Sequence, residues 1–363
     1  MLFSSFQLGP VTLDNRVAMA PMTRSRTSQP GDVPNDMMAT YYAQRANAGL
    51  IITEGAPVSD VARGYSMTPG IYTQAHIDGW KKVTDAVHAK GGKIYIQLWH
   101  VGRRSHEVIA GETPLSASAV KVPDQVFGPL AEGGFGMIET SLPRAMTKQD
   151  IEQTIADFVQ AAKNSIEAGF DGVEIHGAHG YLFDQFMRKA SNQRTDEYGG
   201  SAQNRLRFLI ETLDSVGEAI GRDRVAVRLS PHVMEGDGSV DDEIEQLVIE
   251  LAKHFAVKPL AYLHLSENIS NYLPVPDEFR KTLRDEYKGA IMVAGKLTKD
   301  SAQQLLASGL IDLCAFGTPY VTNPDLVARF KQGWPLAEFD ADARLSLYGG
   351  SEQGYIDYPN YSA

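Results

Sequence analysis

Eight short apolar runs rich in β-branched residues recur along the chain, and helical patterns separate them. The runs cover residues 16–23, 50–56, 93–99, 172–177, 225–230, 262–267, 291–295 and 313–317. Strands that alternate with helices form parallel βαβ units, because each helix returns the chain to the starting edge of the sheet. Eight such units predict an α/β fold, a closed (β/α)8 TIM barrel, with an open doubly wound sheet as the alternative.

Capping residues mark the ends of the helices between these runs. The segment 147–169 begins with Thr147, whose hydroxyl can accept a hydrogen bond from the first turn, and it ends at Gly169. The segment 298–309 likewise begins with a threonine and ends at a glycine, and 74–91 is a further helix candidate. We therefore expect helices to connect successive strands on the outside of a barrel.

Aliphatic and polar residues alternate within several of the predicted strands. Parallel strands covered by helices place aliphatic side chains on their outward face. The outward set is Ile94, Ile96, Leu98, Val173, Ile175, Val225, Val227 and Leu229. The inward set is Tyr95, Gln97, Trp99, Glu174, His176, Arg228 and His264, of which His264 is expected to be structural. Inward polar residues near the strand ends predict an active site at the carboxyl end of the barrel.

The longest insertion follows the third predicted strand, from about residue 101 to 146. It is rich in Gly, Pro and Ser and too long for an ordinary connection. We expect a loop or hairpin excursion that covers one side of the site. No linker or internal repeat divides the chain, which predicts one domain over residues 1–363.

Composition excludes several classes of partner. The 34 Lys and Arg against 45 Asp and Glu give a net charge of −11, without a basic run, which argues against nucleic-acid and anionic-membrane surfaces. Neither a secretory signal nor an apolar run of membrane-spanning length is visible. The single cysteine, Cys314, cannot form an intramolecular disulfide and fits a reducing compartment. We expect a cytoplasmic globular enzyme, a monomer or weak homo-oligomer, that acts on small molecules.

The segment GVEIHGAHGYLFDQF, residues 172–186, concentrates the candidate chemistry. His176 and His179 could be metal ligands, incidental core residues or a pair that holds a substrate oxygen. A metal site needs further ligands, and the histidine spacings of zinc hydrolases are absent. Tyr181 favours the third interpretation, because a tyrosine with a pKa of about 10 keeps a proton to donate. Two imidazoles and a phenol suit a carbonyl that gains negative charge during a reaction.

The sequence lacks the common motifs that would supply a nucleophile or bind a dinucleotide electron donor. The chain has neither a GxSxG nucleophile elbow nor a GxGxxG after its first strand, and Cys314 in an apolar strand is expected to be structural. Glycines end strands seven and eight, in VAGKLT and FGTP. Barrel enzymes commonly hold a phosphate there on backbone amides, so a phosphorylated cofactor is expected inside the barrel.

Several motifs in fixed order resemble one family over nearly the whole chain. These are APMTRSR, QLWHVGR, HGAHGYL, SNQRTDEYGGS, NPDLVARF and the C-terminal YGG and GYIDYP. The chain resembles the old yellow enzyme family of FMN-dependent ene reductases, and especially its bacterial N-ethylmaleimide reductases, morphinone reductases and plant oxophytodienoate reductases.

The resemblance implies roles that agree with the inward-facing set. Thr23 would bind the flavin O4, Gln97 its pyrimidine edge and Arg228 its N1 and O2 side. Other cofactor contacts would be Pro21, Met22 and Gly55 at the ring and Gly295, Lys296, Gly317 and Thr318 at the phosphate. His176 and His179 would hold the substrate oxygen, and Tyr181 would protonate the carbon next to the activating group. The substrate pocket would be shaped by Tyr65, Trp99 and Tyr348.

Two residues depart from the family pattern. The family commonly has a phosphate-binding arginine where this chain has Thr318, and Lys296 is expected to compensate as a point charge. Arg104 occupies a position that is usually aliphatic, where it either changes the rim of the site or pairs with an acidic residue.

The sequence thus predicts a flavin oxidoreductase that binds FMN non-covalently. NADPH or NADH would reduce the flavin, and the reduced flavin would reduce activated C=C bonds in enals, enones, maleimides and nitroalkenes. Nitrate esters would be further substrates. The alternative is a metal-dependent barrel hydrolase or lyase that uses His176 and His179.

Overall fold

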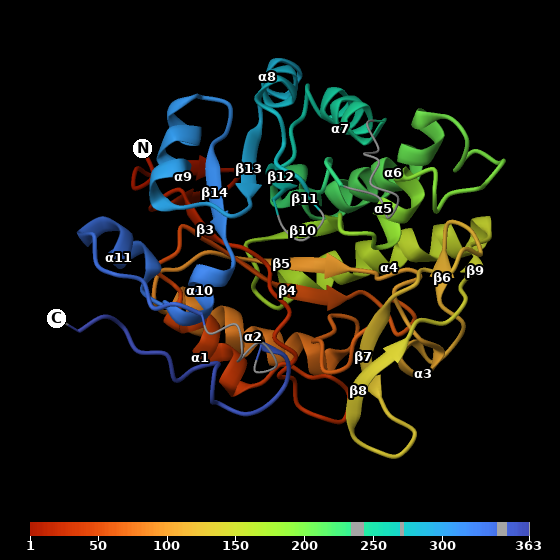
Figure 1. Ribbon diagram of the computed structural model, residues 1–363, viewed down its shortest axis with the longest axis horizontal. Helices are drawn as coiled ribbons and strands as arrows, with labels where there is room; N and C mark the ends of the chain where they lie inside the picture. The colour runs from red at the N-terminus through yellow and green to blue at the C-terminus, as the bar shows by residue number, and fades with distance from the viewer. Residues whose placement is uncertain (234–242, 269–271, 340–346, 363) are drawn as a thin grey trace.

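Eight parallel strands close into a barrel in this computed structural model, which describes residues 1–233, 243–268, 272–339 and 347–362. Each strand pairs with its neighbours in chain order, and the last pairs with the first (Figure 1). The barrel strands are β3 (Val17–Met19), β4 (Leu50–Pro57), β5 (Ile94–Trp99), β10 (Gly172–Gly177), β11 (Val225–Leu229), β12 (Tyr262–Ser266), β13 (Ala290–Ala294) and β14 (Leu313–Phe316). The predicted (β/α)8 barrel is confirmed, and the open sheet is excluded.

Helices follow the barrel strands and surround them. They are α1 (Asp36–Gln44), α2 (Gln74–His88), α4 (Lys148–Glu167), α6 (Ala202–Ile220), α7 (Glu243–His254), α8 (Asp277–Glu286), α9 (Lys299–Ala307) and α11 (Leu326–Gln332). Shorter helical turns are α5 (Leu182–Met187), α10 (Thr318–Thr322) and η1 (Arg222–Arg224). The Thr147 hydroxyl accepts from the Asp150 backbone N–H, and Gly169 follows α4 at φ +91°. Both predicted helix-end signals are therefore confirmed.

The first barrel strand is shorter than predicted. β3 ends at Met19, whereas the sequence predicted a strand up to residue 23. Ala20 still donates its N–H to the carbonyl of Phe316, but Pro21 has no N–H to continue the ladder. The chain leaves the sheet here, which places Met22 and Thr23 in the loop above the barrel.

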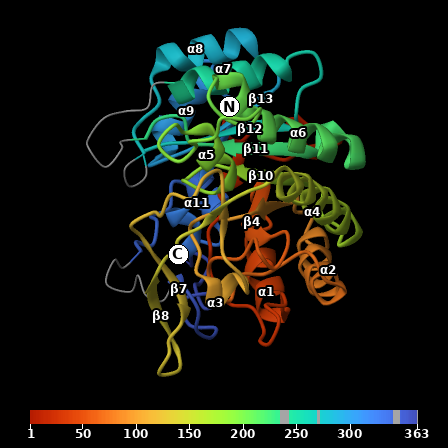
Figure 2. The same ribbon diagram turned by 90° about the vertical axis from the view of Figure 1, so that its right-hand side faces the viewer.

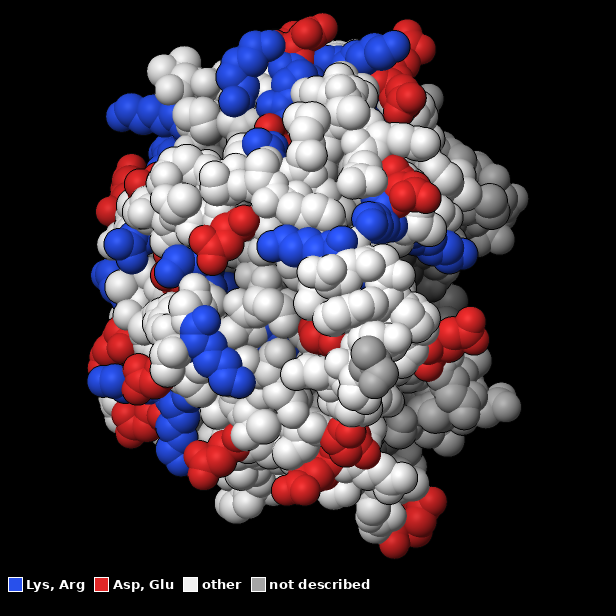
Figure 3. Space-filling view, turned by 90° about the vertical axis from the view of Figure 1, so that its left-hand side faces the viewer, with Lys and Arg blue, Asp and Glu red and all other residues white. Residues whose placement is uncertain are grey.

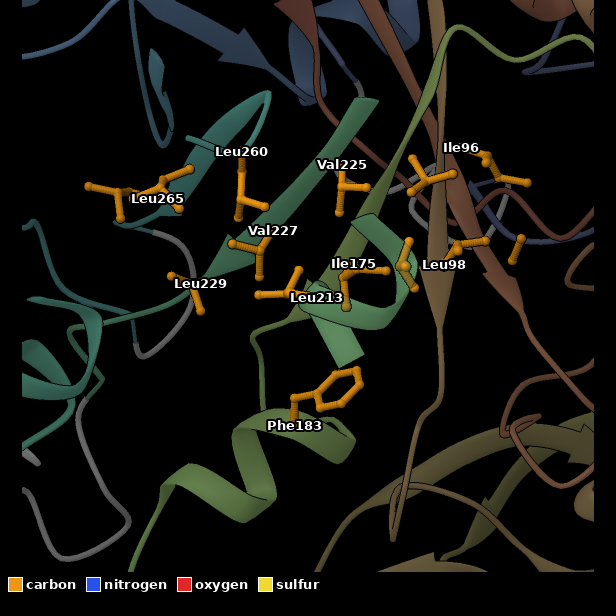
Figure 4. Close-up of a cluster of buried hydrophobic side chains, with 14 of the residues drawn as sticks. Ile96, Leu98, Ile175, Phe183, Leu213, Val225, Val227, Leu229, Leu260 and Leu265 are labelled. Atoms are coloured by element: carbon orange, nitrogen blue, oxygen red, sulfur yellow. The ribbon is translucent and has the colours of Figure 1, made fainter. Parts of the chain in front are cut away.

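Two apolar layers confirm the predicted alternation along the strands. The outer layer lies between strands and helices and includes Ile96, Ile175 and Val227 (Figure 4). The inner layer fills the barrel and includes Tyr95, Ala226, Tyr262, Met292 and Leu313. Leu8 of β1 (Phe6–Leu8) and Leu13 of β2 (Val11–Leu13) belong to that inner layer, so this hairpin closes the amino end of the barrel. The carboxyl end is left for the site.

The insertion after β5 forms small elements of its own. They are α3 (Glu107–Ala110), the pair of β6 (Leu115–Ser116) with β9 (Arg144–Ala145), and the hairpin of β7 (Gln125–Pro129) with β8 (Phe135–Glu139). The hairpin projects from the barrel in two perpendicular views (Figures 1 and 2). The Ser66 N–H donates to the carbonyl of Phe127 at 2.9 Å, which ties the hairpin to the loop after β4.

The segment 347–356 returns to the site along α1 (Figure 1). Arg24 donates to the carbonyls of Leu347 and Gly354, at 3.1 and 2.7 Å. Tyr355 stacks on Tyr41 of α1 with ring centroids 4.1 Å apart. These contacts bring Leu347 and its neighbour Tyr348 to the carboxyl end of the barrel.

Charges of both signs are mixed on the molecular face in Figure 3, where Lys and Arg lie beside Asp and Glu. Within the described residues, every helix is too short or too polar to cross a membrane.

Candidate active site

A cavity of about 800 Å³ opens at the carboxyl ends of the barrel strands. Every residue predicted to contact a cofactor lines it: Pro21, Met22, Thr23, Gly55, Gln97, Arg228, Gly295, Lys296, Gly317 and Thr318. Five residues predicted to bind substrate also line it: Trp99, His176, His179, Tyr181 and Tyr348. Tyr65 lies behind Trp99, with stacked ring centroids 5.4 Å apart. The fold brings the predicted residues together, while their individual roles stay predictions.

The two histidines stand at the end of β10 and are held by hydrogen bonds to other atoms of the chain. The Ala178 N–H donates to His176 Nδ1 at 3.3 Å. His179 has φ +62° and donates its backbone N–H to Ser230 Oγ at 3.0 Å, while its Nε2 lies 2.8 Å from Ser266 Oγ. The rings are perpendicular, with centroids 5.3 Å apart. The end of β10 places His176 at the cavity, and the left-handed backbone conformation at His179 places the second imidazole beside it.

Burial makes both imidazoles neutral at physiological pH. Desolvation, followed by the charge of Arg228, holds the pKa of His176 and the pKa of His179 well below the ordinary value. A neutral imidazole carries one N–H donor. Because His176 Nδ1 accepts from Ala178, its Nε2 carries the hydrogen and can donate into the cavity.

Tyr181 lies at the edge of an aromatic cluster with Tyr65 and Trp99. Its ring is edge-on to the rings of Trp99 and His176, with ring centroids 4.9 Å apart in both cases. Its hydroxyl donates to the Tyr65 hydroxyl at an O···O distance of 3.4 Å. Burial, with a smaller contribution from Tyr65, raises the pKa of Tyr181 well above 10. The phenol therefore keeps its proton at neutral pH and is available as a general acid.

Arg104 pairs with Asp124, which resolves the alternatives that the sequence left open. The pair links the start of the insertion to its hairpin. The guanidinium also lies against Gly180, since a side chain there would approach Arg104 Nε to 2.9 Å. Its charge lowers the pKa of Tyr65 and of Tyr181, against the larger effect of burial.

A buried hydrogen-bond network lies beneath the histidines. Glu174 accepts from Gln97 Nε2 at 2.8 Å and is paired with His264 Nδ1 at 2.7 Å. Burial acts to raise the pKa of Glu174, but His264, Arg228 and the hydrogen bonds lower it below its usual value. We call Gln97, Glu174, His176, His179 and Arg228 the polar wall. In this wall, hydrogen bonds and nearby positive charge stabilise the buried Glu174 carboxylate beneath the cavity.

Features of this wall fit a bound flavin. Arg228 Nε is buried without a hydrogen-bond partner among the described residues, and such donors normally have an acceptor. A Cβ at Gly55 would stand 2.6 Å from the Trp99 ring, so this glycine lets the Trp99 ring lie against the backbone of β4 at the edge of the cavity. The cavity volume lies within the roughly 300–1,000 Å³ range of small-molecule sites.

In contrast to the buried polar wall, the residues that follow β13 and β14 include exposed side chains at the edge of the cavity. We call Gly295, Lys296, Gly317 and Thr318 the open rim. Lys296 and Thr318 are exposed. No hydrogen bond or ion pair of the Lys296 side chain occurs within the described part of the chain. Cys314, below the rim, is buried with a pKa raised by desolvation to about 12, as a structural thiol would be.

Some lining residues were not predicted from the sequence. They are Ala20, Arg24, Ala294, Leu297, Pro319, Val321, Phe339 and Leu347. Arg24 lies within the APMTRSR motif, which could have suggested it. Phe339 and Leu347 reach the site through the path of the C-terminal segment, for which the local sequence holds no signal.

The metal alternative lacks ligands in the described part of the chain. No group of three or more His, Cys, Asp or Glu residues there could hold a metal ion. His179 Nε2 is instead engaged by Ser266.

Comparisons with known proteins agree with this geometry. The model of the NADH:flavin oxidoreductase / NADH oxidase family matches residues 1–337. The chain is 41% identical to 12-oxophytodienoate reductase 7 of Oryza sativa subsp. japonica, over 99% of this chain and 94% of that protein. It superposes on morphinone reductase with a TM-score of 0.94 at 45% identity, covering 99% and 96% of the two chains. The old yellow enzyme homologue from Zymomonas mobilis gives a TM-score of 0.91 at 37% identity, covering 99% of each chain.

A family match over most of the chain, together with relatives of this identity and coverage, shows the family. The chain belongs to the NADH:flavin oxidoreductase / NADH oxidase family of old yellow enzyme homologues, and it is an NAD(P)H-dependent flavin oxidoreductase.

Proposed function

We propose that this enzyme binds FMN non-covalently and reduces C=C bonds activated by a carbonyl, imide or nitro group. The main supporting observation is that His176, His179 and Tyr181 line the same cavity as Arg228, whose buried Nε has no hydrogen-bond partner among the described residues. Donors for a developing oxyanion and a proton donor thereby adjoin a site with a permanent cation.

The cofactor contacts follow from the lining of the cavity. Arg228 would bind the N1 and O2 side of the flavin, Gln97 its pyrimidine edge and Thr23 its O4. The backbone of Pro21, Met22 and Gly55 would pack on the ring, and the open rim would hold the phosphate, with Lys296 as its cation. When bound, FMN would take a hydride from NADPH or NADH and transfer it to the β carbon of the substrate.

The protein would act on the substrate through hydrogen bonds and one proton. Neutral His176 donates from Nε2 to the carbonyl or nitro oxygen and stabilises the negative charge that develops there. His179 would supply the second donor. Tyr181 gives its hydroxyl proton to the α carbon and recovers a proton from solvent. Each turnover therefore adds one hydride and one proton across the double bond.

Substrate shape would be read by Tyr65, Trp99 and Tyr348. We infer that the insertion at about residues 101–146 covers this side of the site, because its hairpin is bonded to the loop that carries Tyr65 and Ser66. Residues 1–363 would then work as one unit. A nicotinamide would enter the same cavity; one morphinone reductase structure holds tetrahydroNAD. Use of NADPH or NADH as the reductant, a cytoplasmic location and a monomeric or weakly oligomeric state stay predictions.

The test is the visible spectrum of the purified protein before and after heat denaturation. We expect flavin absorption that moves into the supernatant and is identified as FMN by chromatography. A colourless preparation that stays colourless after FMN is added would overturn the proposal. As a functional control, the FMN-loaded protein should oxidise NADPH or NADH faster when 2-cyclohexenone is present.

A further inference from the structure

Ser266 is a buried hydroxyl that joins the two halves of the site. It ends β12, is 0% exposed and does not line the cavity. Its Oγ lies 3.2 Å from Arg228 Nη2 and 2.8 Å from His179 Nε2. It therefore stands between the cation proposed to bind the flavin and an imidazole proposed to bind the substrate oxygen. The sequence motifs did not single it out.

The direction of these two hydrogen bonds follows from what each group can donate. A guanidinium has donors only, so Ser266 Oγ must accept from Arg228. The serine hydrogen then needs an acceptor, because leaving a buried hydroxyl hydrogen unpaired is unfavourable. Within the described part of the chain, the other group bonded to this oxygen is His179 Nε2. Donation from Ser266 to His179 satisfies both groups at once.

This direction determines where His179 carries its hydrogen. A neutral imidazole that accepts at Nε2 is protonated at Nδ1. The imidazole is neutral because burial and Arg228 keep its pKa low. His176 has the reverse arrangement, since its Nδ1 accepts from the Ala178 N–H. The two rings would therefore present different nitrogens, Nε2 of His176 and Nδ1 of His179, as donors.

We propose that Ser266 is a positioning residue that fixes the Nδ1–H tautomer of His179 and so sets the second donor for the substrate oxygen. The role in substrate binding rests on the proposed function, whereas the tautomer does not. Arg228 polarises the serine oxygen and strengthens its donation to His179. The tautomer and orientation of His179 are thereby fixed before the substrate arrives, which lowers the entropy lost on binding.

The experiment compares Ser266→Thr with Ser266→Val, because threonine and valine have nearly the same shape and differ in the hydroxyl. Ser266→Ala is the smaller alternative if added volume prevents folding, and thermal melting checks each variant. Long-range ¹H–¹⁵N spectra of histidine-labelled protein as purified report the tautomer of each imidazole. A His179→Gln sample assigns the signal.

We expect an Nδ1–H signal for His179 in the wild type and in Ser266→Thr, and its loss in Ser266→Val and Ser266→Ala. The Michaelis constant for an enone should rise about tenfold in the variants without the hydroxyl, as one lost hydrogen bond predicts. Ser266→Thr should keep the Michaelis constant of the wild type, and the flavin absorbance of each variant checks that the Arg228 side of the site is intact.

An Nε2–H signal in the wild type would overturn the inference, and so would identical spectra of the threonine and valine variants. The spectra require no turnover, so this failure is distinguishable from failure of the proposed ene reductase activity. If enones are not reduced at all, the tautomer result still decides the role of Ser266.

Discussion

The polar wall and the open rim border the same cavity but are built differently. In the wall, Glu174 is fully buried and bonded to Gln97 and His264, and Arg228 and His179 share Ser266. On the rim, Lys296 and Thr318 are exposed, and the described residues form no comparable network around them. The wall is organised by the folded chain itself, whereas the rim is expected to be completed by the ligand.

This difference indicates how the two regions should respond to mutation. A buried network supplies preorganised charges for chemistry, and removing one member leaves its partners unpaired. An exposed cation contributes to ligand affinity and little to folding. Substitutions in the wall should therefore alter catalysis or stability, and substitutions on the rim should alter cofactor retention.

The largest effect is expected for Tyr181→Phe, beside the wall. Removal of a general acid should slow reoxidation of the reduced enzyme by an enone about 10²- to 10⁴-fold. Reduction by NADPH should change little, because that step needs no proton from the phenol. Stopped-flow absorbance measures both half-reactions. An unchanged reoxidation rate would remove Tyr181 from the mechanism.

Arg228→Met tests the wall as a folding element. It removes the charge that, after His264, lowers the pKa of the buried Glu174 carboxylate, so the free energy of unfolding of the flavin-free protein should fall by about 1–3 kcal/mol. The matched rim variant, Lys296→Met, should change it by less than about 0.5 kcal/mol. Urea unfolding provides the comparison. Equal losses in the two variants would contradict the distinction between wall and rim.

Lys296→Ala tests the rim as the phosphate anchor. Loss of the exposed charge should weaken FMN binding about tenfold, while Lys296→Arg should keep the affinity. Thr318→Arg should strengthen binding, because a guanidinium can contact phosphate with two hydrogen bonds. Fluorescence titration of flavin-free protein gives the dissociation constants. If all three variants match the wild type, Lys296 is not the compensating cation.

The smallest effect is expected from pH. His176 and His179 have pKa values well below 6.5, and the pKa of Tyr181 is well above 10. The histidines stay neutral as pH falls toward 6, and the phenol stays protonated as pH rises toward 9. Reoxidation by the enone should therefore vary less than about twofold between about pH 6 and about pH 9. A titration step near pH 6.5 would mean that a site histidine becomes charged.

The sequence predicted the barrel because eight strand-like runs are separated by helical patterns, and several of these runs alternate aliphatic and polar residues. That alternation also identified Gln97, Glu174 and Arg228 as inward-facing, and the cavity contains Gln97 and Arg228. The end of β3 was placed too late, although Pro21 could have indicated it. Pairing of Arg104 with an acidic residue was one predicted alternative, but Asp124 as its partner was not predicted. The hydrogen bond from Arg24 to Leu347 and the position of Ser266 were not predicted either. Each depends on how loops and neighbouring strands meet, which local patterns do not encode.

The most direct test of the account is product analysis of a single turnover in deuterium oxide. Enzyme reduced by unlabelled NADPH is mixed anaerobically with 2-cyclohexenone, and the product is examined by mass spectrometry and NMR. We expect one saturated ketone per flavin, with solvent deuterium at the α carbon; the β carbon can carry either isotope, because the N–H hydrogen of a reduced flavin exchanges with solvent. Absence of the saturated ketone, or unlabelled hydrogen at the α carbon, would show that the protein does not reduce the C=C bond in this way.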